Sequence, residues 1–285
     1  MKKKIISVIV GVAGLAAAYF VVSGISHIVY NRPVENAAAE STAESTEQGT
    51  EEAKAAMTED EINEMLAGMK ETAETETATE EQSEVIPVKF EELQAVNPDV
   101  YAWITVPGTD IDYPILQHAS DNTYYLMHNI DGSYGYPGCI YTENMNSKDF
   151  TDNNTVIYGH NMKNGSMFAQ LHKFEDPDFF KENREVLIYL PDEVLHYTIF
   201  AAHIYDDRHL LYSFDFTDPE VYQKYLDSIF NTRDMSANID KDITVTTDDQ
   251  IITLVTCIGS KPNNRLLVQA VLTDREAGTE AENAE

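Results

Sequence analysis

Short apolar segments recur along the chain between residues 100 and 273, and Gly, Pro, Asn and Asp separate them. These segments are rich in Val, Ile, Thr, Tyr and Phe, which is typical of β-strands. Nine candidate strands follow this pattern: VYAWITV, IDYPILQ, GCIYTE, NTVIYGH, EVLIYL, LHYTIFAAHIY, DITVTT, QIITLVTC and RLLVQAVLT. Many short strands at modest spacing predict a mainly β domain, folded as a barrel or a sandwich.

Helical patterns occur at three places, one before the first strand and two between strands. VKFEELQAVNPD predicts a short helix that ends before Pro98, and SMFAQLHKF predicts another that begins at Ser166. The third, TDPEVYQKYLDSIFN, begins at Thr217, and Glu220 stands three residues later as the partner in a capping box. The apolar side chains of this third segment form one broad stripe, which core packing explains fully.

The N-terminus predicts a membrane anchor. Three lysines precede an apolar stretch, from Ile5 to Tyr30, that is long enough to span a bilayer. The basic flank favours the cytoplasm, so residues 1–33 are predicted to form a basic cytoplasmic tip and a single-pass transmembrane signal-anchor. The rest of the chain would then lie outside the cell membrane. A cleaved signal peptide is the alternative, but the apolar run exceeds the usual signal core.

An acidic segment follows the anchor. Residues 34–84 carry sixteen Asp and Glu against two Lys, with few large apolar residues, which predicts a disordered tether. Within it, TEDEINEMLAGMK predicts a short helix over 58–70. Residues 85–274 are predicted to form the globular domain, and 275–285 a loose acidic tail. The net charge of −30 argues against a nucleic-acid partner.

The two cysteines differ in their surroundings. They lie 118 positions apart, so one disulfide stays an open alternative, and their spacing fits no metal-binding motif. Cys139 is predicted to be a small buried side chain. Cys257 ends the strand IITLVTC, and Arg265 opens the next strand, so a hairpin would place both at one end of the sheet. An arginine there favours a thiolate and can stabilise an oxyanion, whereas the alternative is a buried thiol beside a solvent-facing arginine.

A nucleophilic cysteine usually needs a partner that transfers protons. Among the eight histidines, His160 is distinctive because the apolar strand NTVIYGH ends on it. Two strands therefore end on reactive side chains, and a third begins with an arginine, which indicates a site at the strand ends.

At these residues the sequence resembles a known family. YGHNMKNGSMF, TLVTC and the downstream Arg265 resemble sortases, the membrane-anchored cysteine transpeptidases of Gram-positive bacteria. The stretches FEELQAVNPDVYAWITVPGTDIDYPILQ, DNTYYL and GCIYTENMNS are similar to class B sortases in particular. The resemblance extends over roughly residues 90–272. It implies an eight-stranded β-barrel with N-terminal helices and one helix before the last strands.

The resemblance also implies roles for individual residues. Cys257 would be the nucleophile, His160 the general acid and base, and Arg265 the group that orients substrate or stabilises the oxyanion. The positions that would line the substrate groove are Asn122, Leu126, Thr256, Leu211 and Tyr212. No metal or organic cofactor is implied. Two positions depart from the family: Ile258 replaces an acidic residue of some class B relatives, and Cys139 replaces a common serine.

The activity implied by the resemblance is transpeptidation. A surface protein would present a C-terminal sorting signal, Cys257 would attack at a Thr–Gly-type bond, and the thioester would pass to an amine of a cell-wall precursor or a pilin lysine. Two alternatives stay open. The chain could be an extracytoplasmic cysteine peptidase that hydrolyses its thioester, or a non-catalytic surface binding module.

Overall fold

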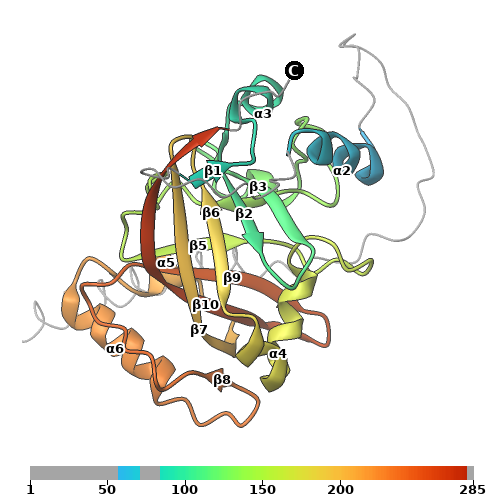
Figure 1. Ribbon diagram of the computed structural model, residues 1–285. Helices are drawn as coiled ribbons and strands as arrows, with labels where there is room; N and C mark the ends of the chain where they lie inside the picture. Colours follow the sequence, from blue (N-terminus) through green and yellow to red (C-terminus); the bar gives the residue numbers. More distant parts are fainter. Residues whose placement is uncertain (1–56, 71–83, 281–285) are drawn as a thin grey trace, which may run out of the picture. The chain divides into compact units, whose positions relative to one another are not determined.

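The computed structural model describes residues 57–70 and 84–280, which all belong to one compact unit, Lys54–Glu285 (Figure 1). The predicted anchor (1–33), most of the predicted tether and residues 281–285 lie outside the described residues. Of the helices in the described ranges, none is long and apolar enough to cross a membrane.

Eight strands close into a barrel, as the resemblance implies. Their order around the ring is β10-β9-β5-β4-β3-β2-β6-β7, and β7 pairs with β10 to complete it. Neighbouring strands are antiparallel except for β3–β4 and β5–β9. The bounds are β2 Val100–Val106, β3 Ile111–Leu116, β4 Ile140–Thr142, β5 Asn154–Tyr158, β6 Glu185–Tyr189, β7 Glu193–Asp206, β9 Ile251–Ile258 and β10 Lys261–Glu280.

Alternation along the strands separates the barrel interior from its outer face. On β9, Ile252 and Leu254 belong to the cluster that fills the barrel, whereas Ile251 and Val255 belong to a second cluster outside it. That outer cluster is covered by α6, Pro219–Phe230 (Figure 1). Side chains at odd-numbered positions near the end of β9 therefore face outward.

The remaining elements decorate the barrel. Two short strands extend the sheet, with β1 (Glu84–Ile86) beside β10 and β8 (Asn238–Ile239) beside β7. Besides α6, the helical elements within residues 84–280 are α3 Phe90–Val96, η1 Tyr124–Leu126, η2 Phe168–Glu175, α4 Pro177–Glu182 and α5 Leu210–Ser213. The segment SMFAQLHKF thus forms mainly the 3-10 helix η2. The N-cap of α6 is Asp218, not Thr217, because the Asp218 carboxylate accepts from the backbone of Glu220 and Val221.

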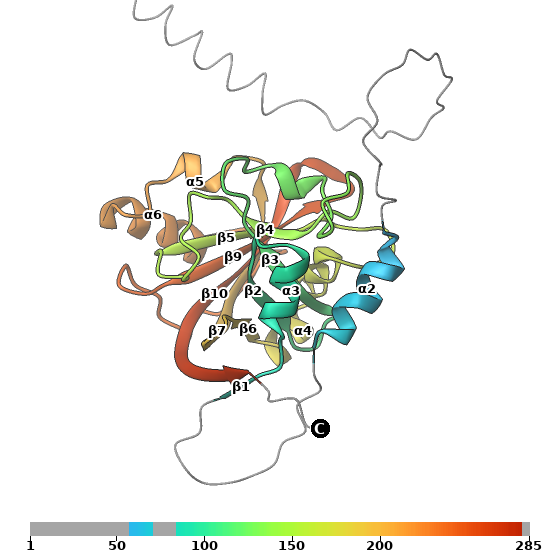
Figure 2. The ribbon, with the colours of Figure 1, turned by 90° about the horizontal axis from the view of Figure 1, so that it is seen from above.

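The helix expected over 58–70 is present as α2, Glu59–Gly68, with the capping box of Thr58 and Glu61. It packs against the barrel domain (Figures 1 and 2). Ile62 and Leu66 are buried in a cluster that includes Ile130. Burial against the domain stabilises a helix that would be marginal in isolation.

Two sequence expectations need correction. DITVTT forms bends and turns rather than a strand, and Val245 packs into the outer cluster beneath α6. The first six residues of the predicted loose tail, 275–280, continue β10. Arg275 forms an ion pair of 2.7 Å with Glu193, and β1 runs parallel to this end of β10. Pairing with both neighbours makes this stretch a strand despite its acidic composition.

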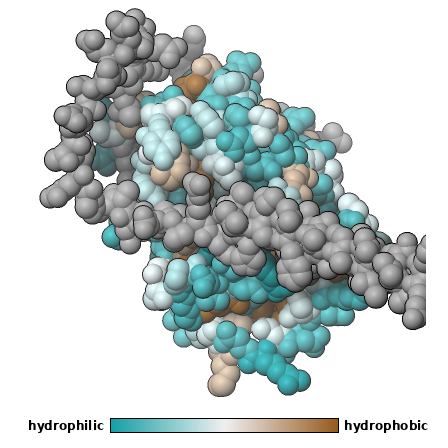
Figure 3. Space-filling model, turned by 180° about the vertical axis from the view of Figure 1, so that it is seen from behind, coloured by the Kyte–Doolittle hydropathy of each residue, from teal (hydrophilic) through white to brown (hydrophobic). Residues whose placement is uncertain are grey.

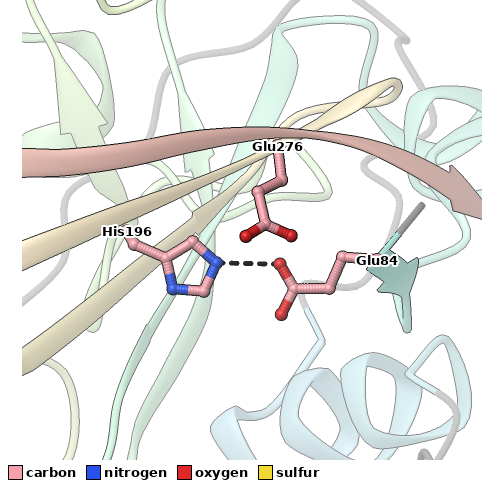
Figure 4. A group of neighbouring side chains, drawn as sticks. All are labelled: Glu84, His196 and Glu276. Atoms are coloured by element: carbon pink, nitrogen blue, oxygen red, sulfur yellow. Dashed lines mark hydrogen bonds and ion pairs between the residues drawn. The ribbon is translucent and has the colours of Figure 1, made fainter. Parts of the chain in front are cut away.

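A cluster of charged side chains joins β1 to the barrel (Figure 4). His196 Nε2 lies 2.8 Å from the Glu84 carboxylate, and His196 Nδ1 lies 3.5 Å from Glu185. Burial opposes protonation of His196, but the hydrogen bonds and charges of both glutamates outweigh it and raise its pKa. The imidazolium form therefore helps to hold β1 in place.

Candidate active site

Cys257 and Arg265 lie side by side at one end of the barrel. Cys257 is exposed near the C-terminal end of β9, and it faces outward like Val255 two residues earlier. Arg265 on β10 is its direct partner in the antiparallel register. Cross-strand partners project from the same face of a sheet, so the guanidinium and the thiol share the outer face.

His160 approaches Cys257 from the other neighbour of β9. The strand β5 runs parallel to β9 with Tyr158 opposite Val255, and the Gly159 N–H donates to Val255 O at 3.1 Å. Continuing this register by two residues brings His160 level with Cys257. The backbone register thus brings His160 and Arg265 to the two sides of Cys257.

The surroundings of His160 fix its tautomer. Its Nε2 lies 2.7 Å from the carbonyl oxygen of Leu126, and a carbonyl only accepts, so Nε2 carries the proton. The lone pair of the neutral ring is then on Nδ1. The Tyr136 ring packs edge-on at 5.2 Å between centroids. Burial lowers the pKa of His160, and the hydrogen bond to Leu126 opposes this only in part.

The backbone at the start of β10 holds the guanidinium of Arg265. Nη1 donates to the carbonyl oxygens of Pro262 and Asn264, at 3.0 and 2.9 Å. Within the described ranges no acidic side chain pairs with Arg265. Its charge is thus uncompensated and half-buried, which suits the binding of an oxyanion.

Two polar side chains lie against the backbone carbonyl of Cys257, and Asn161 donates to it. Asn161 Nδ2 lies 2.9 Å from this oxygen and His172 Nε2 lies 3.1 Å from it. Sequence reasoning missed both residues, although Asn161 directly follows His160 in the YGHNM motif.

Comparison with known proteins places the chain in a family. The family model for the sortase domain matches residues 104–273. The chain belongs to the sortase family. Sortase B of Listeria monocytogenes is 34% identical over 191 residues, which cover 66% of this chain and 75% of that protein.

Solved structures agree. The X-ray structure of Clostridium perfringens sortase B has a TM-score of 0.59 and 33% identity, and the match covers 65% of this chain and all of that one. A class B sortase of Streptococcus pyogenes, involved in pilus biogenesis, has a TM-score of 0.57 and 29% identity over 65% of this chain and 98% of its own. The chain is therefore a class B sortase, and sortases are cysteine transpeptidases.

Five positions of this sortase are predicted to line the substrate groove, and the structure places them in different surroundings. The Leu126 carbonyl contacts His160 directly. Tyr212 is 65% exposed and its ring packs at a tilt against His209, while the neighbouring Leu211 is half-buried against the outer cluster. Asn122 accepts a hydrogen bond of 2.9 Å from the backbone of Asn144. These four positions are thus partly or fully exposed.

Thr256 differs from the other four positions. It is 1% exposed, and its hydroxyl donates to the carbonyl oxygen of Gly159 at 2.9 Å. Its hydroxyl therefore links β9 to the residue before His160 and does not face a substrate.

A buried pair supports α5, the short helix that contains Tyr212. His209 Nε2 lies 2.7 Å from the Glu143 carboxylate, and both side chains are 6% exposed. His209 is also the N-cap of α5, because its ring nitrogen accepts from the backbone of Tyr212. The pair joins α5 to the residue after β4. Sequence spacing gives no signal for it, since the two residues lie 66 positions apart.

Polar and apolar surfaces are distributed unevenly on this sortase. The described surface that is visible in Figure 3 is mostly hydrophilic. Few large apolar side chains are exposed in the described ranges, and two of them, Tyr136 and Tyr212, belong to segments around the site. Of these two, Tyr136 packs edge-on against His160.

Cys139 is a buried free thiol, and one group of potential metal ligands lies apart from Cys257. Both cysteines are free, and Cys139 is buried with its Sγ 3.4 Å from His128 O. One group of potential metal ligands was found in the described residues: Glu84, His196 and Glu276, with ligand atoms within 4.8 Å of one another (Figure 4). Glu276 lies eleven residues along β10 from Arg265, so this group is separate from the Cys257 site.

Proposed function

We propose that Cys257 is the nucleophile of this sortase, His160 its general acid and base, and Arg265 the group that stabilises the oxyanion. The observation that supports the proposal is the register of β5, β9 and β10. It brings an imidazole and a guanidinium, which has no acidic partner among the described residues, to the two sides of an exposed thiol. These are the components that acyl transfer through a thioester requires.

The first half-reaction forms the thioester. The Cys257 thiolate attacks the carbonyl carbon of threonine in a Thr–Gly-type bond of a C-terminal sorting signal. The carbonyl oxygen becomes an oxyanion, which Arg265 stabilises. His160, protonated on Nδ1, donates that proton to the leaving amine as the C–N bond breaks.

The second half-reaction transfers the acyl group. An acceptor amine attacks the thioester carbonyl, Nδ1 of His160 takes the proton, and the C–S bond breaks to regenerate the thiolate. The acceptor belongs to a cell-wall precursor or to a pilin lysine. The Streptococcus pyogenes relative, involved in pilus biogenesis, supports the second as a candidate.

The groove for the sorting signal is formed by Asn122, Leu126, Leu211 and Tyr212. The contact between Leu126 and His160 supports a substrate path that ends beside Cys257. Residues 1–33 anchor the chain in the cell membrane, with this groove on the outer side. The basic flank and the long apolar run support that orientation.

The proposal is tested with a pentapeptide library that fixes Thr–Gly and randomises the first three positions, with hydroxylamine as a general amine. Mass spectrometry should detect a threonine hydroxamate, and intact mass should detect an acyl group on Cys257. Cys257→Ala should abolish both signals, whereas the matched control Cys139→Ala should retain them.

Three results would contradict the proposal. Retained hydroxamate formation by Cys257→Ala would exclude Cys257 as the nucleophile. If the peptide ending in a threonine carboxylate forms at the same rate with and without hydroxylamine, and no hydroxamate forms, the enzyme is a hydrolytic peptidase. Absence of both products across the whole library would exclude the Thr–Gly-type signal.

A further inference from the structure

The β5–β9 ladder ends just before the reactive residues. The N–H of Gly159 donates to Val255 O, and carbonyls two residues apart on a strand point to the same edge. Cys257 O is therefore the next acceptor on that edge. The strand β5 ends at Tyr158, and the chain turns back after His160, where Asn161 bridges to Met167.

Side chains take the place of the missing ladder bond. Asn161 Nδ2 donates to Cys257 O at 2.9 Å and lies 3.0 Å from His172 Nε2. His172 Nδ1 in turn lies 2.7 Å from the Glu175 carboxylate. Glu175 and His172 come from η2, so the chain of contacts runs from η2 to the nucleophile.

The donor and acceptor roles follow from the carboxylate. Because ionised Glu175 only accepts, the proton of a neutral His172 is on Nδ1. Nε2 then accepts from Asn161, which directs the amide nitrogen rather than the amide oxygen at Cys257. The neutral ring is therefore the form that orients Asn161, because only an unprotonated Nε2 can accept from the amide nitrogen.

We propose that Asn161, oriented by His172 and Glu175, is a positioning residue that keeps Cys257 and His160 in register. The inference rests on the proposed roles of those two residues. Asn161 follows His160 directly, so its side chain fixes the backbone of His160 to that of Cys257. The Phe168 N–H, which donates to His160 O at 2.9 Å, closes the loop from the other side.

The test compares Asn161→Asp and Asn161→Ala with the wild type on a peptide selected from the library. Aspartate keeps the shape of asparagine but offers only acceptors, so it repels the Cys257 carbonyl. A displacement of about 1 Å costs on the order of 100-fold in rate. We expect kcat to fall by that factor for Asn161→Asp and KM to change less than about twofold, since the groove is unchanged.

A matched control is Asn231→Asp. Asn231 Nδ2 also donates to a backbone carbonyl, that of Asp227 at 2.8 Å, but at the end of α6. It should leave kcat unchanged. His172→Ala should lower kcat by about tenfold, and the double variant with Asn161→Ala should be no slower than Asn161→Ala alone, because residues of one network are not additive.

Outcomes separate this inference from the proposed function. If Asn161→Asp and Asn161→Ala keep kcat within about twofold of the wild type while Cys257→Ala is inactive, the positioning role is overturned and the nucleophile stands. If Cys257→Ala is active, both proposals fail. A fall in kcat that tracks the unfolded fraction, measured by circular dichroism at the assay temperature, would reduce Asn161 to a structural residue and also overturn the inference. Independent additive losses in the double variant would exclude orientation by His172.

Discussion

Replacing Gly159 by alanine tests how tightly the core holds His160. Gly159 lies between β5 and His160, and an added Cβ would point into the barrel. It would lie 2.5 Å from Ile140 Cδ1 and 2.6 Å from Phe168 Cγ. Carbon atoms in contact need at least about 3.5 Å, so the backbone or its neighbours must move by about 1 Å. Both neighbours are fully buried, so the core resists that movement.

Two consequences follow from this clash. Overpacking a core costs about 1–3 kcal/mol, and this amount should be lost from the free energy of unfolding. The Gly159 backbone donates to Val255 O and accepts from Thr256, which both precede Cys257. A shift of about 1 Å between His160 and Cys257 should therefore lower kcat on the order of 100-fold.

Urea unfolding measures the first effect, and hydroxamate formation measures the second. Gly68→Ala is the matched control, because its added Cβ meets nothing within 4 Å. Ile140→Val removes the methyl group nearest to the new Cβ, so the double variant Gly159→Ala/Ile140→Val should be more stable than the sum of the single effects predicts. Wild-type stability and rate in Gly159→Ala would refute the argument.

Three further predictions concern the rest of the domain. His196→Gln should lose stability mainly at low pH. The pKa of His196 is raised in the folded state, so its contribution to the free energy of unfolding is full below about pH 6.5 and is lost as the pH rises through the folded pKa. Urea unfolding of both proteins at pH 5.5 and 8.5 measures this difference, and an equal loss of stability at the two pH values would contradict the prediction. Leu66→Ala should lower the free energy of unfolding by about 2–4 kcal/mol, and an unchanged urea midpoint would mean that α2 does not dock. Iodoacetamide should label only Cys257 in the folded protein, since burial raises the pKa of Cys139; two labelled thiols in peptide mapping would contradict this.

Short runs of β-branched and aromatic residues between turn residues predicted most of the barrel strands, even where a strand such as β2 or β9 is buried on both faces. The prediction of a strand for DITVTT was wrong for a physical reason. Its β-branched residues favour a strand, but a closed ring offers few free edges, and the free part of β7 is occupied by β8. Val245 instead anchors the segment under α6. The opposite error concerns the acidic end of β10, which was predicted to be a loose tail but forms a strand. Its backbone pairing with β7 and β1 outweighs the acidic composition.

The site was predictable where chemistry coincides with strand ends. His160, Cys257 and Arg265 could be selected because each terminates or opens an apolar run. The residues that contact the backbone of Cys257 could not be predicted from the sequence. Asn161 and His172 reach Cys257 across 96 and 85 positions, through a turn and a 3-10 helix whose conformations no periodicity encodes.

The pKa of His160 gives a prediction whose sign depends on the proposed mechanism. The active form needs His160 protonated and Cys257 as thiolate, so lowering the pKa of His160 makes that form scarce near neutral pH. Tyr136 is 54% exposed and covers the His160 ring, and Tyr136→Ala should admit water and raise this pKa toward 6.5.

The pH profile of kcat/KM should then change in two ways. Its acid limb, which reports the histidine of the coupled pair, should move to higher pH. The plateau above that limb should rise, because the fraction of thiolate–imidazolium pairs grows with the pKa of the imidazole. Tyr212→Ala, which removes an aromatic ring that packs on His209 instead, is the control and should leave the acid limb in place. A limb that stays fixed in Tyr136→Ala, or moves to lower pH, would mean that burial by Tyr136 does not set the protonation of His160.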